Sequence, residues 1–399
     1  MPSFLRGKSR YRFAVLRTNY QTKYSAHHMK KLTVGLLLPV STIIPMGKDF
    51  EQGLKQAIND QVDQHEWEIE LIPEFIGQGS RSRVEESIDK LFSYHQADVV
   101  TGIVSNAVGM ALAPKFERYK KPFIMNNIGE HIPNPESFNP YVFINSIHTW
   151  QQIWSLGHWA VKTFGNKGMF VASVYDAGYS FTNMLTLGME AADKDSTMPF
   201  SIAQITPGAK TADPRTVFEH IEMFKPDFVF SAFCGEEASA FQEAYAGSAV
   251  KNIPLLALPF LLQNFDAKDH ELEIYTALSS AELIPTGESA ALQDQPFYQL
   301  GKETGMILTE ALKIKGIGDL LEALNQVKVN SDRGTLHIDA QTPGKNNQVY
   351  LVKNIHLGNR DNIKREVVRK LETVDINDKA LSDSLQQISS GWENPYLGI

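Results

Sequence analysis

The fold is decided by the stretch Lys31-Leu-Thr-Val-Gly-Leu-Leu-Leu38, which a short loop joins to Lys48-Asp-Phe-Glu-Gln-Gly-Leu-Lys-Gln-Ala-Ile-Asn59. The first part is a nearly continuous apolar run, typical of a strand that is buried on both faces of a parallel sheet. In the second part, apolar residues recur at the spacing of one helix face. Residues 98–119 repeat the strand, loop and helix, and residues 122–130 repeat the strand and loop. Such units align their loops outside the carboxyl ends of the strands, where small ligands bind in open α/β sheets.

The same alternation continues along most of the chain. The first series predicts strands at 32–38, 68–74, 99–104, 122–126 and 141–144, and helices at 48–59, 83–94 and 107–119. A second series begins at Thr149 and predicts helices at 151–164, 180–192, 214–224 and 236–246, with strands at 168–174, 200–205, 227–230 and 254–258. The last elements must join the halves already built. They are a strand-like segment at 275–283, a helix at 296–313 and strands at 334–338 and 348–352. Because both series have the same unit order, we expect two similar lobes.

A chain of 399 residues exceeds what one hydrophobic core usually fills, which also favours two domains. The fold class that we predict is α/β, with two Rossmann-like lobes joined by three hinge crossings near Ser146, Ser279 and Gln341. One lobe is expected to contain residues 30–146 and 279–340, and the other residues 147–278 and 341–374. Residues 1–29 would form a basic extension and residues 375–399 a C-terminal tail, in which Trp392 and Tyr396 either dock on a lobe or stay mobile.

Composition and charge exclude several classes of function. The formal net charge of −8 argues against a nucleic-acid partner, because no concentrated basic face is visible beyond the N-terminus. Cys234 is the only cysteine, which excludes an internal disulfide and every multi-cysteine metal site. The sequence contains no nucleophile elbow, phosphate loop, metalloprotease helix or dinucleotide fingerprint. We therefore expect a binding protein that is not an enzyme and that uses neither a metal nor a cofactor.

Two segments bear on targeting and on membranes. Residues 1–28 are basic but lack the apolar core of a secretory signal, so we expect either a flexible extension or an upstream start that the cell does not use. Residues 32–47 are apolar, yet Pro39 and Pro45 interrupt them and a helix follows at once, so they are predicted to form a strand and its loop. No other stretch is a candidate for a transmembrane segment.

A set of motifs follows the chain in a fixed order. The motifs are residues 31–41, Gly47-Lys-Asp-Phe-Glu-Gln-Gly-Leu-Lys-Gln-Ala57, Asp98-Val-Val-Thr-Gly-Ile-Val-Ser105, Lys121-Pro-Phe-Ile-Met125, Lys225-Pro-Asp-Phe-Val-Phe230, Gly334-Thr-Leu-His-Ile-Asp339 and Gln348-Val-Tyr-Leu-Val352. This ordered set, from residue 30 to residue 354, resembles the leucine/isoleucine/valine-type periplasmic binding proteins. No single motif is diagnostic.

The resemblance implies a type I two-lobed fold that closes on one small ligand like a Venus flytrap. It implies a receptor that delivers an amino acid or a related carboxylate or amide to the permease of an ABC transporter. A periplasmic location follows from the resemblance, although the sequence shows no signal peptide. The alternative is a cytoplasmic sensor of the same fold that regulates a partner protein.

The resemblance also places ligand contacts in the loops that follow the strands. In this family the loop after the fourth strand holds a ligand carboxylate, and here that loop is Ser105-Asn106-Ala107. The start of a helix offers unpaired N–H donors and a positive dipole end to an anion. The alternative is that Ser105 or Asn106 only caps its helix.

The next loop contains Ile128 and Glu130, where amino-acid binders usually have a small residue and a threonine. Glu130 either accepts a hydrogen bond from a ligand ammonium group or is a solvated loop carboxylate. The opening loop at 41–46 either covers the apolar end of the ligand or is an ordinary turn.

In the second half, Tyr175 and Tyr179 lie where the family often presents an aromatic ring to the ligand. We prefer Tyr179, and the alternative is an ordinary partly buried tyrosine. The following loop supplies Phe233 as an aromatic candidate and Glu236 as an acidic one, while Cys234 is expected to pack as a small buried group.

The strand end at Leu258-Pro259-Phe260 departs from the family, because amino-acid binders commonly have an acidic residue near this place. Phe260 is the candidate contact here. Either Asp176, Glu236 or Glu130 pairs with a ligand ammonium group, or the ligand has none, since a buried unpaired ammonium costs several kcal/mol.

Overall fold

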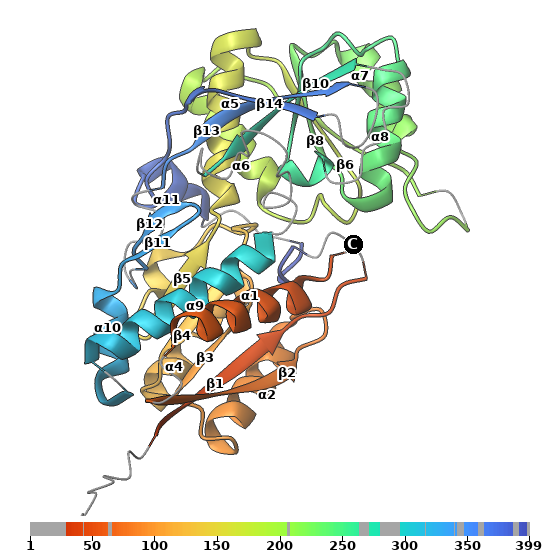
Figure 1. The fold of residues 1–399 in the computed structure, drawn as a ribbon. Helices are drawn as coiled ribbons and strands as arrows, with labels where there is room; N and C mark the ends of the chain where they lie inside the picture. The colour runs from red at the N-terminus through yellow and green to blue at the C-terminus, as the bar shows by residue number, and fades with distance from the viewer. Residues whose placement is uncertain are drawn as a thin grey trace, which may run out of the picture.

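The computed structural model describes residues 29–42, 44–62, 66–205, 208–262, 271–279, 296–315, 317–338, 340, 347–357, 363–385 and 391–396. In these ranges the chain forms two α/β lobes, each built on its own sheet (Figure 1). The fold class predicted from the sequence is confirmed. The basic residues 1–28 and the crossing expected near Gln341 lie outside the described residues.

The first lobe contains a five-stranded parallel sheet in the order β2-β1-β3-β4-β5. Its strands are β1 (Lys30–Leu38), β2 (Trp67–Phe75), β3 (Val99–Ile103), β4 (Phe123–Asn127) and β5 (Val142–Ser146). The last three strands are buried along their whole length, because helices cover both faces of the sheet. One face packs against α1 (Met46–Gln61) and α9 (Pro296–Lys315), and the other packs against α2 (Arg81–Ser93) and α4 (Ala113–Tyr119).

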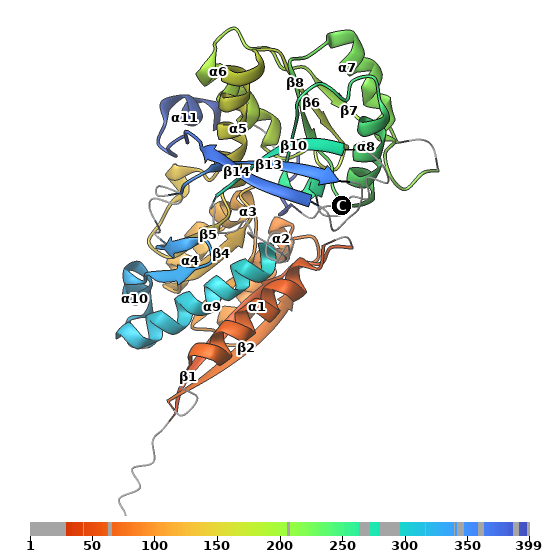
Figure 2. The same ribbon diagram turned by 45° about the horizontal axis from the view of Figure 1, so that its top comes forward.

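The helices α1 and α9 lie side by side in both views, although they are far apart in the sequence (Figure 1, Figure 2). Gly53 of α1 and Gly301 of α9 permit this contact, because a Cβ at either position would overlap the backbone of the other helix. The late helix α9 is therefore part of the first lobe's packing.

The helix predicted at 107–119 is broken, and that prediction was wrong in this detail. The structure has α3 (Asn106–Ala111) and then α4, with Leu112 between them. Pro114 lies in the first turn of α4, where its missing N–H costs nothing, whereas one continuous helix would lose a hydrogen bond there.

The second lobe contains a seven-stranded sheet in the order β14-β13-β10-β9-β8-β6-β7. Its strands are β6 (Gly168–Ala172), β7 (Phe200–Ile202), β8 (Phe228–Ala232), β9 (Leu255–Ala257), β10 (Glu271–Leu278), β13 (Tyr350–Leu357) and β14 (Ile363–Lys370). From β7 to β10 the strands are parallel and repeat the order of the first sheet, with β6 in the place of β1. The strands β13 and β14 add an antiparallel hairpin at the β10 edge.

Helices cover both faces of this second sheet too. One face packs against α5 (Thr149–Phe164) and α6 (Phe181–Ala192). The other packs against α7 (Phe218–Phe224) and α8 (Gly235–Gly247), with Phe241 and Tyr245 of α8 in its core. The internal similarity of the two lobes thus extends to their layers.

Several elements of the second half of the chain differ from the sequence prediction. The strand predicted at 334–338 does not join either large sheet: β12 (Gly334–Leu336) pairs only with β11 (Val329–Ser331) in a separate ribbon. The helix predicted at 214–224 begins as a 3-10 turn, η2 (Pro214–Val217), before α7. The sequence did not predict β14, α10 (Leu320–Gln326) or α11 (Lys379–Leu385), whose short polar patterns resemble loops.

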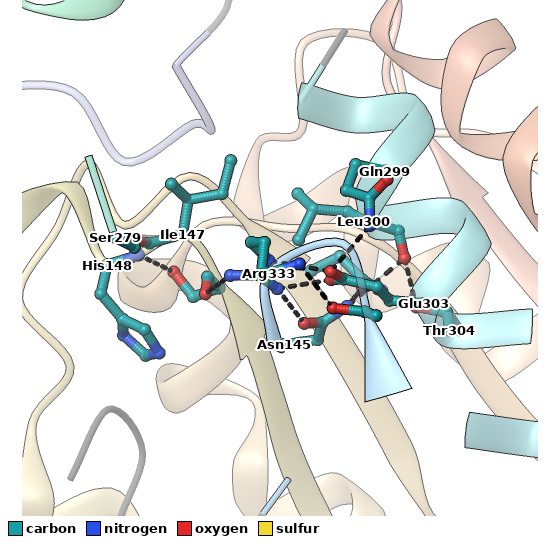
Figure 3. Close-up of polar contacts among 12 residues, drawn as sticks. Asn145, Ile147, His148, Ser279, Gln299, Leu300, Glu303, Thr304 and Arg333 are labelled. Carbon is teal, nitrogen blue, oxygen red and sulfur yellow. Dashed lines mark hydrogen bonds and ion pairs between the residues drawn. The ribbon is translucent and has the colours of Figure 1, made fainter. Parts of the chain in front are cut away.

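A buried ion pair lies where the two lobes meet (Figure 3). Arg333, in the turn of the β11–β12 ribbon, forms a two-pronged ion pair with Glu303 of α9, with Nε 2.8 Å from Oε1. Its guanidinium also donates to Asn145 Oδ1 and to the carbonyl oxygen of Ser146, each at 2.8 Å. The end of β5 is therefore fixed to α9 and to the ribbon.

A second polar contact joins two chain segments at the same junction. The side chain of Gln152 in α5 donates to Ser279 Oγ at 2.5 Å and to the carbonyl oxygen of Ile147 at 3.1 Å. The hydroxyl of Ser279 in turn donates to Ile147. Ile147 follows β5 of the first sheet and Ser279 follows β10 of the second, so these bonds join the ends of one strand from each sheet.

Candidate functional site

In each lobe the strand order reverses at one point, between β1 and β3 in the first sheet and between β6 and β8 in the second. Loops diverge at such a point and leave a crevice in which α/β proteins bind ligands. The two crevices meet, since the N–H of Ser180 donates across the lobes to the carbonyl oxygen of Glu130 at 3.2 Å. Residues 391–396 lie in this shared crevice, because they form hydrogen bonds with Ser105 of the first lobe and with Asp176 and Tyr179 of the second.

Ser105 is fully buried at the end of β3. Its Oγ accepts a hydrogen bond from the N–H of Val108 at 3.1 Å, which makes Ser105 the N-cap of α3. The same hydroxyl donates to the carbonyl oxygen of Glu393. Ser105 therefore caps its helix and also presents its hydroxyl to the crevice.

Asn106 is used within its own lobe. Its Nδ2 donates to the carbonyl oxygen of His131 at 2.7 Å, and its Oδ1 accepts from Asn127 Nδ2 at 2.8 Å. Ala107 follows in the first turn of α3 and is half-buried. These bonds make Asn106 a brace between two loops of the first lobe.

Glu130 is fully buried, and neither of its carboxylate oxygens has a hydrogen-bond partner among the described residues. Burial raises the pKa of Glu130 to about 8. The alternative of a solvated loop carboxylate was therefore wrong, because the side chain has no access to water.

In the opening loop, Ser41 Oγ accepts from the N–H of Ile44 at 3.1 Å, as in an ordinary turn.

Tyr179 and Asp176 face the crevice from the loop after β6. The hydroxyl of Tyr179 donates to the carbonyl oxygen of Pro395 at 3.2 Å and accepts from Asn394 Nδ2 at 3.2 Å. The carboxylate of Asp176 accepts from the hydroxyl of Tyr396 at 2.5 Å. Burial raises the pKa of Asp176 to about 7, so this carboxyl is near its titration point at neutral pH.

Three aromatic rings enclose the ring of Tyr396, and we call them the aromatic pocket. Their centroids lie 5.2 Å (Tyr179), 5.6 Å (Phe181) and 5.0 Å (Phe260) from the centroid of Tyr396. Only 1% of Tyr396 is exposed. Distances of this kind are typical of edge-to-face and tilted aromatic pairs, so the pocket fits a flat ring.

The structure does not bring the remaining candidates to this place. The ring of Phe233 stacks on Phe241 at 4.7 Å in the core of the second lobe. Glu236 is exposed at the start of α8, and the buried carboxylate is that of the next residue, Glu237, which accepts from the N–H of Ala212 at 2.5 Å. Tyr175 is half-buried.

Two residues of the crevice were missed in the sequence. His131 Nε2 donates to the carbonyl oxygen of Asn394 at 3.4 Å, and burial lowers the pKa of His131 to about 4, so the ring is neutral at pH 7. Phe181 belongs to the aromatic pocket. His131 follows the predicted contact Glu130 by one position, and Phe181 follows the predicted contact Tyr179 by two. This proximity was the only signal in the sequence for either residue.

A small apolar cavity of about 50 Å³ lies beside the crevice. It is lined by Ile128, Ile147, Thr149, Gln152, Pro259, Phe260, Leu278, Pro296, Gln299, Leu300 and Arg333. Phe260 therefore contributes to both the aromatic pocket and this cavity. The candidate Ile128 lies at the cavity and not among the hydrogen-bond donors of the crevice.

The described parts of the chain also bear on metal binding and on membranes. In those parts, no group of three His, Cys, Asp or Glu side chains is placed to hold a metal ion. None of the helices there is both long and apolar enough to cross a membrane.

Comparison with known proteins places this fold and crevice in a family. The model of a family described as periplasmic binding protein matches residues 31–282, which is more than half of the chain. No relative among curated protein sequences matches the chain.

Solved structures show the same fold. An ABC transporter substrate-binding protein from Sphaerobacter thermophilus has a TM-score of 0.70 at 22% identity, over 87% of this chain and 99% of that one. A solute binding protein from R. palustris in complex with benzoate has a TM-score of 0.64 at 20% identity, over 88% and 99% of the two chains. A leucine binding protein from Thermotoga maritima has a TM-score of 0.60 at 16% identity, over 84% and 98%. Together with the match of the family model, this two-lobed fold shows that the chain belongs to the periplasmic binding protein family.

Proposed function

We propose that this chain is the solute receptor of an ABC transporter, which closes its lobes on a small polar ligand and presents the closed form to the permease. One observation carries the proposal: side chains from both lobes line a buried crevice, and together they bind the segment 391–396 that lies in it. Ser105 and His131 come from the first lobe, and Asp176 and Tyr179 from the second. A ligand that contacts both sides binds the closed form better and shifts the population toward it.

The proposed lobes are residues 30–146 with 279–340, and residues 147–278 with 341–374. The packing of α9 on α1 supports the first grouping, and the membership of β10, β13 and β14 in the seven-stranded sheet supports the second. The Arg333 network also supports the first grouping, because it joins β5, α9 and the β11–β12 ribbon, and it would fix the end of β5 at which the chain leaves this lobe.

Within the class of amino acids and related carboxylates, the crevice favours a ligand with a flat ring. The aromatic pocket of Tyr179, Phe181 and Phe260 fits such a ring, and Asp176 would accept from a hydroxyl or an ammonium group. Solved relatives support a carboxylate with an aromatic ring and also an amino acid. Two from R. palustris are in complex with benzoate and 4-hydroxybenzoate, and one from Streptococcus pneumoniae is in complex with isoleucine. We propose an aromatic carboxylate or an aromatic amino acid.

Thermal unfolding of the full chain with benzoate, 4-hydroxybenzoate, tyrosine, leucine and isoleucine would test this. A ligand that binds only the folded protein raises its stability by about 2.7 kcal/mol at 100 times the dissociation constant. We expect a saturable rise in Tm with the ring-bearing compounds, which is reduced in a Phe260→Ala variant. A rise with leucine or isoleucine alone would contradict the proposed ligand class.

The proposed location is the periplasm, where a receptor of this family meets its permease. Fractionation of the cells that produce the protein should find it in the periplasmic fraction. Recovery with the cytoplasmic enzymes would instead favour a regulatory sensor and would overturn the transport proposal.

A further inference from the structure

Residues 391–396 are held in the crevice through their backbone. Three successive carbonyl oxygens accept hydrogen bonds from crevice side chains: Glu393 from Ser105 Oγ, Asn394 from His131 Nε2 at 3.4 Å, and Pro395 from Tyr179 Oη at 3.2 Å. One step earlier, the N–H of Trp392 donates to the carbonyl oxygen of Gly178 at 3.2 Å. A run of bonded carbonyl groups is how a bound peptide is held, and the donors here come from both lobes.

The side chain of Tyr396 anchors the segment. Its ring fills the aromatic pocket and its hydroxyl donates to Asp176. Along the segment the side chains pass from exposed at Trp392 and Glu393, through half-buried at Asn394, to buried at Pro395 and Tyr396. A single buried aromatic anchor with more exposed neighbours is the pattern of a specific contact.

The surface of the crevice matches the segment in shape. A Cβ added at Gly178 would overlap the indole ring of Trp392, and a Cβ at Gly79 would lie 2.7 Å from Cδ of Pro395. Glycine at both positions thus leaves room for the segment, one in each lobe. Gly79 also has a φ of +82°, which a side chain disfavours.

The segment uses the groups that a solute would need. While it is bound, the hydroxyls of Ser105 and Tyr179 and the carboxylate of Asp176 are all engaged, and the aromatic pocket is filled. The segment is also tied to the protein by α11, whose Leu381 is buried in the main core. A short connection of this kind gives a tethered group an effective concentration in the millimolar range.

We propose that residues 391–396 are a tethered peptide ligand of the crevice, which holds the two lobes together and competes with free solute for the same groups. Free solute binds only when this segment has left. The competition with solute rests on the proposed function, whereas recognition of the peptide rests on the contacts of residues 391–396 alone.

The test uses the full chain in three forms: unmodified, Tyr396→Ala and Glu393→Gln. Tyr396→Ala removes the anchor, whereas Glu393→Gln alters an exposed side chain and keeps the bonded carbonyl group. The probe is a fluorescein-labelled peptide with the sequence of residues 391–399, followed by anisotropy. We expect the Tyr396→Ala chain to bind this peptide at least about tenfold more tightly than the other two forms, because they keep their own competitor in place.

A second readout uses the single cysteine. Cys234 is buried, and its thiol lies beside the hydroxyl of Tyr396. Its labelling by a maleimide should be about tenfold faster in the Tyr396→Ala chain than in the unmodified and Glu393→Gln chains, because labelling follows the open population. If Tyr396→Ala does not fold, Tyr396→Phe keeps the ring, loses only the hydroxyl and should give a smaller change in the same direction.

The outcomes separate this inference from the proposed function. Equal peptide binding and equal Cys234 labelling in all three forms would overturn the tethered ligand, even if solute binds. Tight peptide binding to Tyr396→Ala, displaced by a ring-bearing solute, supports both. Tight peptide binding without displacement by any solute supports the tethered ligand and contradicts the proposed solute class.

Discussion

The hydroxyl of Tyr396 donates to the carboxylate of Asp176 at 2.5 Å, and this bond joins the C-terminal segment to the loop after β6. A leucine at position 176 would leave that hydroxyl buried without its acceptor, which costs about 1–3 kcal/mol. Asp176→Leu should therefore speed the maleimide labelling of Cys234 about tenfold, since each 1.4 kcal/mol is a factor of ten. Asp176→Asn keeps an acceptor and should label within about twofold of the unmodified chain. Identical rates for the two variants would show that this bond does not hold the segment.

Gly178→Ala should release the same segment from the other side. The added Cβ would overlap the ring of Trp392, while the backbone of Gly178 has no positive φ that would forbid alanine. The Cys234 labelling rate should rise, and the labelled peptide should bind this variant more tightly than it binds the unmodified chain. Gly247→Ala is the matched control, because a Cβ there meets no atom within 4 Å. If Trp392 swings aside without freeing the segment, the two alanine variants will label alike.

The burial of Glu130 leads us to expect that the stability of the protein depends on pH. Burial raises its folded-state pKa from 4.5 to about 8, so between these values the folded protein keeps a proton that the unfolded chain has released. The contribution of Glu130 to the free energy of unfolding therefore falls as pH rises through this window. At pH 8 Glu130→Gln should be more stable than the unmodified chain by roughly 4 kcal/mol, since one pKa unit is about 1.4 kcal/mol, and at pH 4 the difference should vanish.

Urea unfolding at pH 4, 6 and 8 measures this difference. The exposed Glu136 is the control, and Glu136→Gln should change the free energy of unfolding by less than about 0.5 kcal/mol at every pH. A Glu130→Gln chain with the same pH profile as the unmodified chain would mean that Glu130 titrates normally.

Loss of one partner of the buried ion pair of Arg333 and Glu303 should destabilise the protein strongly. Replacement of both partners by apolar residues should cost much less stability. These side chains are 5% and 0% exposed, so Arg333→Met leaves a buried carboxylate without its partner, at a cost of about 3–5 kcal/mol. The double variant Arg333→Met with Glu303→Leu should regain most of that loss. The exposed pair of Arg215 and Asp213 is the comparison, and Arg215→Met should cost less than about 1 kcal/mol. Urea denaturation of the unmodified chain, of Arg333→Met, of Glu303→Leu and of the double variant gives the coupling energy, and additive losses would argue against a shared network.

The elements of both lobes were predictable because they depend on local patterns. Buried strands such as β3 and β8 are mostly apolar, and helices such as α2 repeat apolar residues at one face. The loop positions of Ser105 and Tyr179 followed from the strand ends. The break at Leu112 and the separate β11–β12 ribbon did not follow, because a turn and a pairing of three residues leave almost no pattern.

The direction of a side chain within a loop was harder to predict. Phe233 and Phe260 both follow strands of the second sheet, yet one points into the core and the other toward Tyr396. Similarly, Ser105 reaches the crevice while its neighbour Asn106 bonds within the lobe. Both members of each pair are candidates by residue type and by a place in a loop after a strand, and only the packed backbone decides between them.

The contacts that close the crevice were the least predictable, because they join residues far apart in the sequence. Tyr396 and Asp176 are separated by 220 positions, and Arg333 and Asn145 by 188. No periodicity or motif links such residues. From the sequence, Trp392 and Tyr396 either docked on a lobe or stayed mobile, and the character of residues 391–396 did not decide between the two.

The position of Tyr396 has a consequence for truncated forms of the protein. The strands of both large sheets precede this residue in the sequence. A chain that ended before Tyr396 would therefore keep every strand of both sheets and lose the ring that fills the aromatic pocket. Loss of a few residues would change the crevice without removing any strand that builds it.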